Sequence, residues 1–138
     1  MASINLKGRE VPLLYTTWEM KLIQEEIAKL EDFRYIVFGR NKDDEGDDSL
    51  YGSPQQLDAI AKMIRILGNA GLEEAGENPD LTDKKVLRSL KPIELAGALK
   101  ACSEAMAEGM ASEYEPEKQE GPVDVTLEEM NRKKKREN

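Results

Sequence analysis

The stretch IRILGNAGLEEAGENPDLTDKKVLRSLKPIEL, residues 64–95, decides the fold, because two short apolar helical patterns flank a hinge of Gly, Asn and Pro. The upstream helix should end between Leu67 and Gly76, since Gly68 and Gly71 weaken a helix interior. We therefore interpret Gly68, Gly71 and Gly76 as helix terminators. A hinge of this kind would let the helices on either side fold back against a third helix.

Downstream of the hinge, two more helices are predicted. Thr82 can cap a short helix that carries Val86 and Leu87, and Lys91-Pro92 then breaks the chain. The longer helix that follows has apolar residues at steps of three and four, with Ala and Gly elsewhere, so it can pack closely against its neighbours. These apolar residues are Leu95, Leu99, Cys102, Met106 and Met110.

Nearer the N-terminus, a helix is predicted from a capping signal. Thr16 is followed three residues later by Glu19, which is the spacing of a capping box, and apolar residues continue at helical intervals as far as Leu30. The next segment, DFRYIVFG at residues 32–39, suits either a helix or a short strand, and we favour the helix.

A polar, acidic segment separates these residues from the next helix. Its residues 43–48 invite interpretation as a calcium site, but in an EF-hand loop aligned on Gly46 the last position is Gly52, where a bidentate Glu is required. We therefore expect a solvated loop. The helix after it should begin at Ser53-Pro54, with Gln56 completing a capping box.

The N-terminal residues predict a β-hairpin. Residues 4–6 alternate between apolar and polar, Lys7-Gly8-Arg9 can turn the chain, and residues 11–15 resume an extended run. Pro12 should face away from the partner strand, because it has no N–H to donate. A two-stranded hairpin is only marginally stable alone, so it must pack on the helices or on another copy, and its edge is available to a partner.

Composition limits the classes of function. The 138 residues suit one domain with tails, and 28 Asp and Glu against 20 Lys and Arg give a net charge of -8. This charge opposes the binding of nucleic acid phosphates, which depends on Lys and Arg. No apolar run approaches the ~20 residues that span a bilayer, and the first residues lack the apolar core of a signal peptide, so we expect a cytoplasmic protein without a membrane span.

These patterns predict a mainly α protein, a small helical bundle with an N-terminal β-hairpin and a flexible C-terminal tail. The helical domain should cover residues 1–114, and the polar tail residues 115–138. The tail carries the basic run RKKKR at residues 132–136, which we interpret as solvated. The alternative is that this run contacts RNA or another polyanion.

No catalytic, cofactor or metal site is predicted, and we expect no enzyme. The chain has one cysteine and no histidine, which excludes an internal disulfide and a Cys–His catalytic pair. Cys102 lies on the apolar stripe of its helix and should behave as a small buried hydrophobe. Neighbouring carboxylates such as Glu25 and Glu26 point in different directions, so they cannot converge on one substrate atom.

The residue pattern that is left favours an interaction module. An edge hairpin can add a partner strand, and methionines on an apolar helix face tolerate varied partners. The candidate partner-binding residues are Leu99, Met106 and Met110 on the last helix, and Val11 and Leu13 in the hairpin.

Two segments, INLKGREVPLLYTTWEMKLIQEE at residues 4–26 and the stretch at residues 64–95, resemble tail assembly chaperones of long-tailed phages and prophages of Gram-positive bacteria. In that family a strand pair of the form G-x-x-x-x-L-x-x-T leads into a helix, and L-x-N-A-G and P-D-L-T stretches join the later helices. The resemblance implies a mostly helical, non-enzymatic assembly factor that binds the tape measure protein and recruits tail tube subunits.

The resemblance also implies self-association, activity in the host cytoplasm and absence from the mature virion. Many family members make a longer product by ribosomal frameshifting, and Lys133-Lys134-Lys135 is compatible with a slippery adenine-rich messenger sequence. On this hypothesis the hinge at residues 68–79 leaves an apolar face of the last helix open to helices of the tape measure protein. The alternative is that the hinge only closes a helical bundle.

Two other classes of function compete with this interpretation. An acidic phage-encoded inhibitor could mimic nucleic acid and occupy the basic groove of a host enzyme. A small enzyme is the poorer competitor, because the sequence contains neither histidine nor a nucleotide or metal motif.

Overall fold

The computed structural model describes residues 1–40 and 51–111, which form five α-helices and one hairpin. The predicted acidic loop, the tail at residues 115–138 and the basic run within it lie outside the described residues. In chain order the elements are β1 (Ser3–Leu6), β2 (Arg9–Pro12), α1 (Thr17–Glu26), α2 (Leu30–Val37), α3 (Pro54–Glu74), α4 (Asp83–Arg88), the 3₁₀ helix η1 (Pro92–Glu94) and α5 (Leu95–Met110). The expected class, mainly helical with an N-terminal hairpin, is confirmed.

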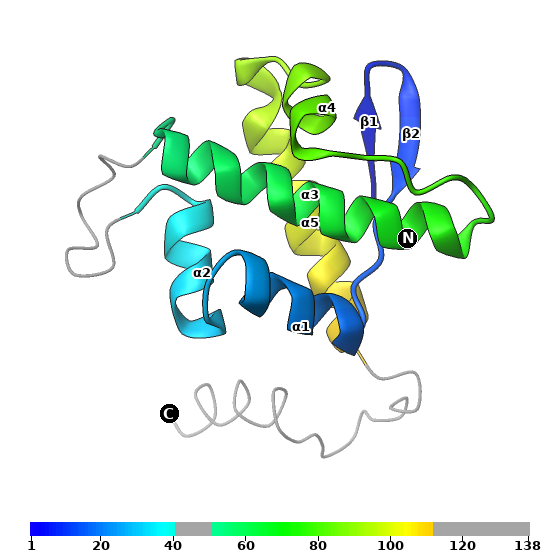
Figure 1. Cartoon of the computed structure of the whole chain (residues 1–138), viewed down its shortest axis with the longest axis horizontal. Helices are drawn as coiled ribbons and strands as arrows, with labels where there is room; N and C mark the ends of the chain where they lie inside the picture. Colours follow the sequence, from blue (N-terminus) through cyan, green and yellow to red (C-terminus); the bar gives the residue numbers. More distant parts are fainter. Residues whose placement is uncertain (41–50, 112–138) are drawn as a thin grey trace, which may run out of the picture.

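Helix α3 is the centre of the fold. It runs across the middle of Figure 1, with α1 and α2 below it, α4 and the hairpin above it, and α5 crossing behind it. The side chains of Ile60, Ile64 and Leu67 are fully buried at its centre. The helix is continuous to Glu74, within the predicted range, but it passes through Gly68 and Gly71 without interruption.

The interpretation of Gly68 and Gly71 as helix terminators is therefore wrong, whereas Gly76 follows the end of α3 with a positive φ of 79°, as that interpretation requires. A side-chain carbon at Gly71 would lie 1.8 Å from the carbonyl oxygen of Pro12, and one at Gly68 would lie 2.7 Å from a methyl group of Leu81. The absence of a side chain lets β2 and the α3 backbone approach closely, and Leu14 N–H donates to the carbonyl of Leu67 over 3.1 Å. Gly68 and Gly71 serve packing, and packing outweighs their low helix propensity.

The predicted hinge at residues 68–79 is shorter than expected, because residues 68–74 belong to α3. A second contact on this helix holds the segment that follows it. The side-chain amide of Asn69 accepts a hydrogen bond from Leu81 N–H at 2.9 Å and donates to the Leu81 carbonyl at 3.2 Å. These bonds fasten the segment before α4 to the C-terminal third of α3. Thr82 caps α4 as predicted, by accepting from Lys85 N–H.

The hairpin is confirmed, although its second strand starts earlier than expected. Lys7 and Gly8 both have positive φ, 55° and 89°, which is the conformation of a two-residue type I′ turn. Such a turn starts pairing at once, so β2 begins at Arg9, opposite Leu6, rather than at Val11.

Pro12 faces away from β1, as predicted. The next residue, Leu13, donates its N–H to the Ala2 carbonyl over 2.9 Å. Neighbouring residues of a strand direct their backbone polar groups to opposite sides, so the backbone of Pro12 is directed away from β1. The Pro12 end of β2 lies against α3, where Gly71 approaches the Pro12 carbonyl. This part of the β2 edge is therefore covered by the chain's own helix.

The capping box at the start of α1 is confirmed. The hydroxyl of Thr16 accepts from the first turn, and Glu19 accepts from Thr16 N–H at 2.8 Å. The helix ends at Glu26 and α2 begins at Leu30, so the expectation of one helix running to Leu30 is wrong. Two shorter helices allow both α1 and α2 to pack on α3, and the helix favoured for the segment before Gly39 is confirmed.

The start of α3 differs in detail from the prediction. Ser53 caps it by accepting from Gln56 N–H at 3.2 Å, but the Gln56 side chain does not return to Ser53. Instead it accepts from Gly52 N–H at 2.6 Å and donates to the Val37 carbonyl at 2.9 Å. Gln56 is 1% exposed, and it ties the end of α2 to the start of α3.

Helix α5 closes the core from the other side. Its residues Leu99 and Cys102 are buried, and its last turn lies against the N-terminal segment. Ala2 N–H donates to the Glu108 carboxylate at 3.0 Å, and a side-chain carbon at Gly109 would lie 2.1 Å from the carbonyl oxygen of Tyr15.

Candidate partner-binding surface

The single thiol of the chain belongs to the core. Cys102 is 1% exposed, and burial raises its pKa to about 12, so the thiol is neutral at physiological pH. Within residues 1–40 and 51–111, no group of three or more Cys, Asp and Glu side chains is arranged to hold a metal ion. In the same ranges, no helix combines the length and the apolar character that crossing a bilayer requires.

Several carboxylates belong to an ion-pair network that joins three helices. Arg65 of α3 bonds to Glu26 of α1 and, at 2.7 Å, to Asp83 of α4, while Lys62 bonds to Asp58 at 2.9 Å and to Asp83 at 3.3 Å. Burial raises the pKa of Asp83, but the hydrogen bond from Arg65 and the two nearby positive charges outweigh it and hold the pKa below its usual value. These carboxylates fix the positions of helices.

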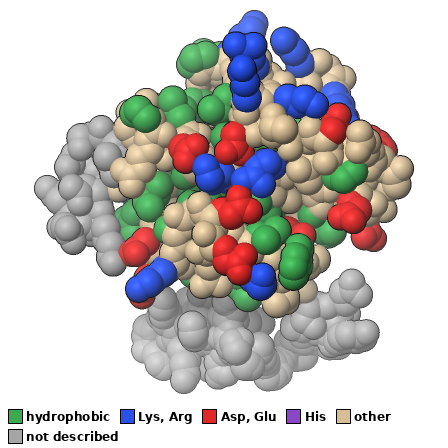
Figure 2. Space-filling model, in the orientation of Figure 1, with side chains coloured by type: hydrophobic (Ala, Val, Ile, Leu, Met, Phe, Trp, Pro, Cys, Tyr) green, Lys and Arg blue, Asp and Glu red, His purple; other side chains and the backbone are tan. Residues whose placement is uncertain are grey.

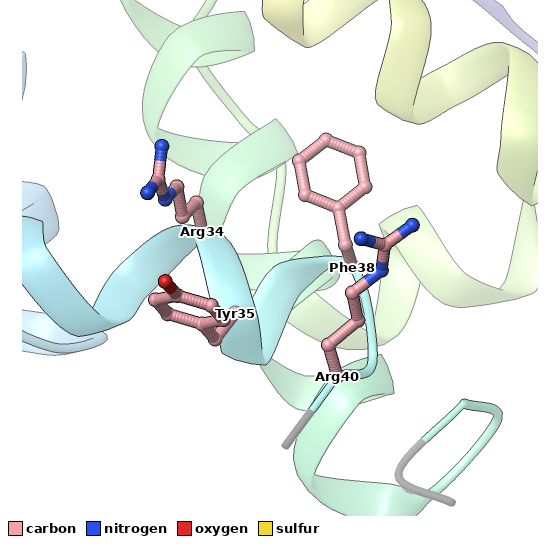
Figure 3. Close-up of a pocket in the computed structure, with 4 residues that line it drawn as sticks. All are labelled: Arg34, Tyr35, Phe38 and Arg40. Carbon is pink, nitrogen blue, oxygen red and sulfur yellow. The ribbon is translucent and has the colours of Figure 1, made fainter. Parts of the chain in front are cut away.

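A cluster of arginine and aromatic side chains lies at the end of α2. Arg34, Tyr35, Phe38 and Arg40 line a cavity of about 350 Å³ (Figure 3), and we call these four residues the α2 surface. Arg34 and Phe38 extend in the same direction from the helix, and the guanidinium group of Arg40 lies on the side of Phe38. The Arg34 guanidinium is 5.2 Å from the centroid of the Tyr35 ring, within cation–π range.

The helical period explains why these residues are on the surface. Phe33 and Val37 of α2 are buried and Ile36 packs against the core, so Arg34 is exposed on the opposite side of the helix and Tyr35 is half-buried. Phe38 follows the last helical residue and is 44% exposed. The chain then turns at Gly39, and a side-chain carbon there would lie 2.7 Å from Cα of Tyr51, which is 60% exposed.

The α2 surface combines aromatic rings with guanidinium groups. Aromatic residues and arginine are enriched at the centres of protein interfaces and carry much of their binding energy, because rings and guanidinium groups bury large areas while keeping polar contacts. No acidic side chain is among the described residues that line the cavity. The surface therefore suits a partner that offers apolar side chains together with carboxylates.

The five residues predicted to bind partners are not brought together on one surface. Val11, Leu13 and Leu99 are buried in the core, and Met106 is partly buried against it. Only Met110, 63% exposed, lies mainly on the surface. The pattern that selected the first four residues marks the core face of their elements.

The α2 surface was missed because its segment was assigned only as helix or strand. In a helix with Phe33 and Val37 on its buried face, Arg34, Tyr35 and Phe38 point away from that face. The helical period of the sequence could therefore have revealed this surface. Comparisons of the chain with protein-family models, with curated proteins and with solved structures found no significant match.

Proposed function

We propose that this chain is a non-enzymatic phage tail assembly chaperone, which binds the tape measure protein and recruits tail tube subunits to it. The observation that carries a binding role is the α2 surface, with its two guanidinium groups, the exposed ring of Phe38 and the half-buried ring of Tyr35. The resemblance of residues 4–26 and 64–95 to tail assembly chaperones supplies the particular role. On this proposal the chain self-associates, acts in the host cytoplasm and is absent from the mature virion.

The geometry of the α2 surface suits an amphipathic partner helix. Apolar side chains of such a helix can cover Phe38 and Tyr51, while acidic side chains beside them pair with Arg34 and Arg40. Covering these rings would shield apolar area on both molecules. A tape measure segment held in this way would be protected from aggregation before the tube forms around it.

The alternative, an acidic decoy for a nucleic-acid enzyme, has less support. A decoy presents ordered, unpaired carboxylates on one face. In the described part of the chain, Asp58, Asp83 and Glu26 bond to cations of α3 instead. Figure 2 shows acidic and basic side chains interspersed over the middle of the viewed face.

The decisive experiment is co-expression with the tape measure and tail tube proteins of the same genome. The proposal predicts that the tape measure protein stays soluble, and co-purifies, only when this chain is present. Failure of the wild-type chain to bind or solubilise the tape measure protein would refute the proposed role.

A matched pair of variants connects this result to the α2 surface. Phe38→Asp should abolish co-purification, because it places a charge where an apolar contact is required. Ile93→Asp is the control, since Ile93 is 86% exposed in η1 and lies outside the α2 surface. Both changes are at exposed positions, so circular dichroism should show the wild-type fold, and equal binding by the two variants would assign the interface elsewhere.

The frameshifting hypothesis is tested separately on the nucleotide sequence. An adenine run at the codons of Lys133-Lys134-Lys135, followed by an overlapping frame, would support a longer product. Alternating AAG codons without such a frame would contradict it. These residues lie outside the described part of the chain.

A further inference from the structure

A second groove lies at the opposite side of α3 from the α2 surface, between the tip of the hairpin and α4. Its volume is about 470 Å³. Lysine and arginine side chains gather at the top of Figure 2, where Figure 1 places α4 and the hairpin tip. We call it the basic groove, and its lining includes Leu6, Leu81, Lys7, Arg9, Lys84 and Arg88.

The positive charges of the basic groove are only partly neutralised. Asp80 pairs with Arg9 at 2.9 Å and with Lys85 at 3.6 Å. Lys7, Lys84 and Arg88 form no ion pair with any described residue, and no carboxylate is among the described lining residues. A chain with a net charge of -8 thus keeps a local excess of positive charge, which attracts anionic groups.

The cations stand on two facing walls. Lys7 and Arg9 belong to the hairpin, whereas Lys84 and Arg88 are four residues apart and therefore lie on one side of α4. Successive side chains of an extended peptide point in opposite directions. An extended segment laid along the groove can therefore direct alternate carboxylates to the two walls.

The floor of the basic groove is apolar. Leu6 and Leu81 line it, and both belong to the buried core, with only the edges of their side chains accessible. An apolar side chain of a bound segment can cover these edges. The groove therefore selects a segment that combines acidic residues with an apolar one.

We propose that the basic groove binds an extended acidic segment of a partner protein, with an apolar side chain over Leu6 and Leu81. Single-stranded nucleic acid fits less well, because its binding sites stack bases on aromatic rings, and no Phe, Tyr or Trp is among the described residues lining the groove. The surrounding negative charge also opposes a long polyanion. The proposal concerns a surface separate from the α2 surface, so it stands independently of the proposed function.

Fluorescence anisotropy of the full chain with a labelled peptide tests the proposal. The probe is a short peptide of Asp and Glu with one central Leu, and the control peptide replaces the acids by Asn and Gln. We expect the acidic peptide to bind, the amide peptide to bind at least about tenfold more weakly, and added salt to weaken the acidic complex. Failure of the acidic peptide to bind the wild-type chain overturns the proposal.

Two pairs of charge reversals assign the binding to the groove. Lys84→Glu with Arg88→Glu should weaken binding by about tenfold or more, because each change removes an attraction and adds a repulsion. Lys29→Glu with Lys100→Glu changes the net charge equally at exposed positions outside the groove and should alter binding by less than about twofold. Equal weakening by both pairs would mean that only the overall charge matters, and would overturn the proposal.

Two further measurements remove the remaining alternatives. If thermal melting shows that the reversed pair is unfolded, Lys84→Gln with Arg88→Gln replaces it, and that milder pair must still weaken binding severalfold. A labelled deoxythymidine oligonucleotide is titrated alongside the peptide. Tighter binding of the oligonucleotide than of the acidic peptide would assign the groove to nucleic acid and contradict the proposal.

Discussion

Replacement of Gly71 by alanine tests the close approach between α3 and β2. The added methyl carbon would lie 1.8 Å from the carbonyl oxygen of Pro12 and 2.4 Å from its carbonyl carbon. Non-bonded heavy atoms require about 3.5 Å, so the two backbones would have to separate by roughly 1.7 Å. Both atoms belong to backbone, and no side-chain rotation can relieve the overlap.

The expected loss of stability follows from three contributions. Overpacking costs about 1–3 kcal/mol, and separation would stretch the hydrogen bond from Leu14 to Leu67, worth about 1 kcal/mol. Alanine recovers about 0.5–1 kcal/mol through its better helix propensity. The free energy of unfolding should therefore fall by about 2 kcal/mol, which lowers Tm by roughly 8 °C for a domain of this size.

Urea and thermal unfolding, followed by far-ultraviolet circular dichroism, measure this effect. Gly97→Ala in α5 is the matched control, because no heavy atom lies within 4 Å of a side-chain carbon at that position. The control should be stabilised by up to about 1 kcal/mol from helix propensity alone. A Gly71→Ala protein that melts at or above the wild-type temperature would refute the packing of β2 on α3.

Four further substitutions test other parts of the fold. Gln56→Ala should lower the free energy of unfolding by about 1–3 kcal/mol in urea titrations, because it leaves the buried carbonyl of Val37 without a donor. Met106→Glu should lower Tm, because the Met106 side chain packs on the core, whereas Met110→Glu should leave Tm unchanged, because Met110 is exposed. An equal loss of Tm in both variants would contradict this difference in burial. Folding lowers the pKa of Asp83, so the ionised carboxylate stabilises the protein above the unfolded pKa of about 4, and this stabilisation is lost as the pH falls through the folded pKa. Asp83→Asn should therefore reduce the drop in Tm measured between neutral and acidic pH.

The parts of the fold that follow from local chemistry were predictable from sequence. Thr16, Ser53 and Thr82 each cap the helix that was expected after them, because a side-chain oxygen at that position satisfies free N–H groups whatever the tertiary context. The place of the hairpin turn was readable from Gly8, which accepts positive φ, but its length was not, because Arg9 was expected in the turn and is the first residue of β2.

The parts that depend on distant partners were not predictable in this way. Gly71 lowers the helix propensity of its segment, so the local sequence predicts that the helix weakens there. The reason for a glycine at this position is the close approach of Pro12, which is distant in sequence. The side chain of Gln56 likewise bonds to a residue that is distant in sequence, because it donates to the Val37 carbonyl of α2 and does not return to Ser53 at the local cap. The basic groove joins Lys7 to Lys84, residues that no short sequence window contains together.

The contact between the first strand and the last helix has a consequence for the order of folding. The hairpin can pair as soon as its turn forms, yet an isolated two-stranded hairpin is marginal in water, and the faces that bury it come from α3 and α5. Bonds such as that from Ala2 to Glu108 close loops of nearly the whole described chain, and such long closures are slow. During synthesis the hairpin is made before α5 but becomes secure only after it, so the domain should gain its stability in one cooperative step once α5 is complete.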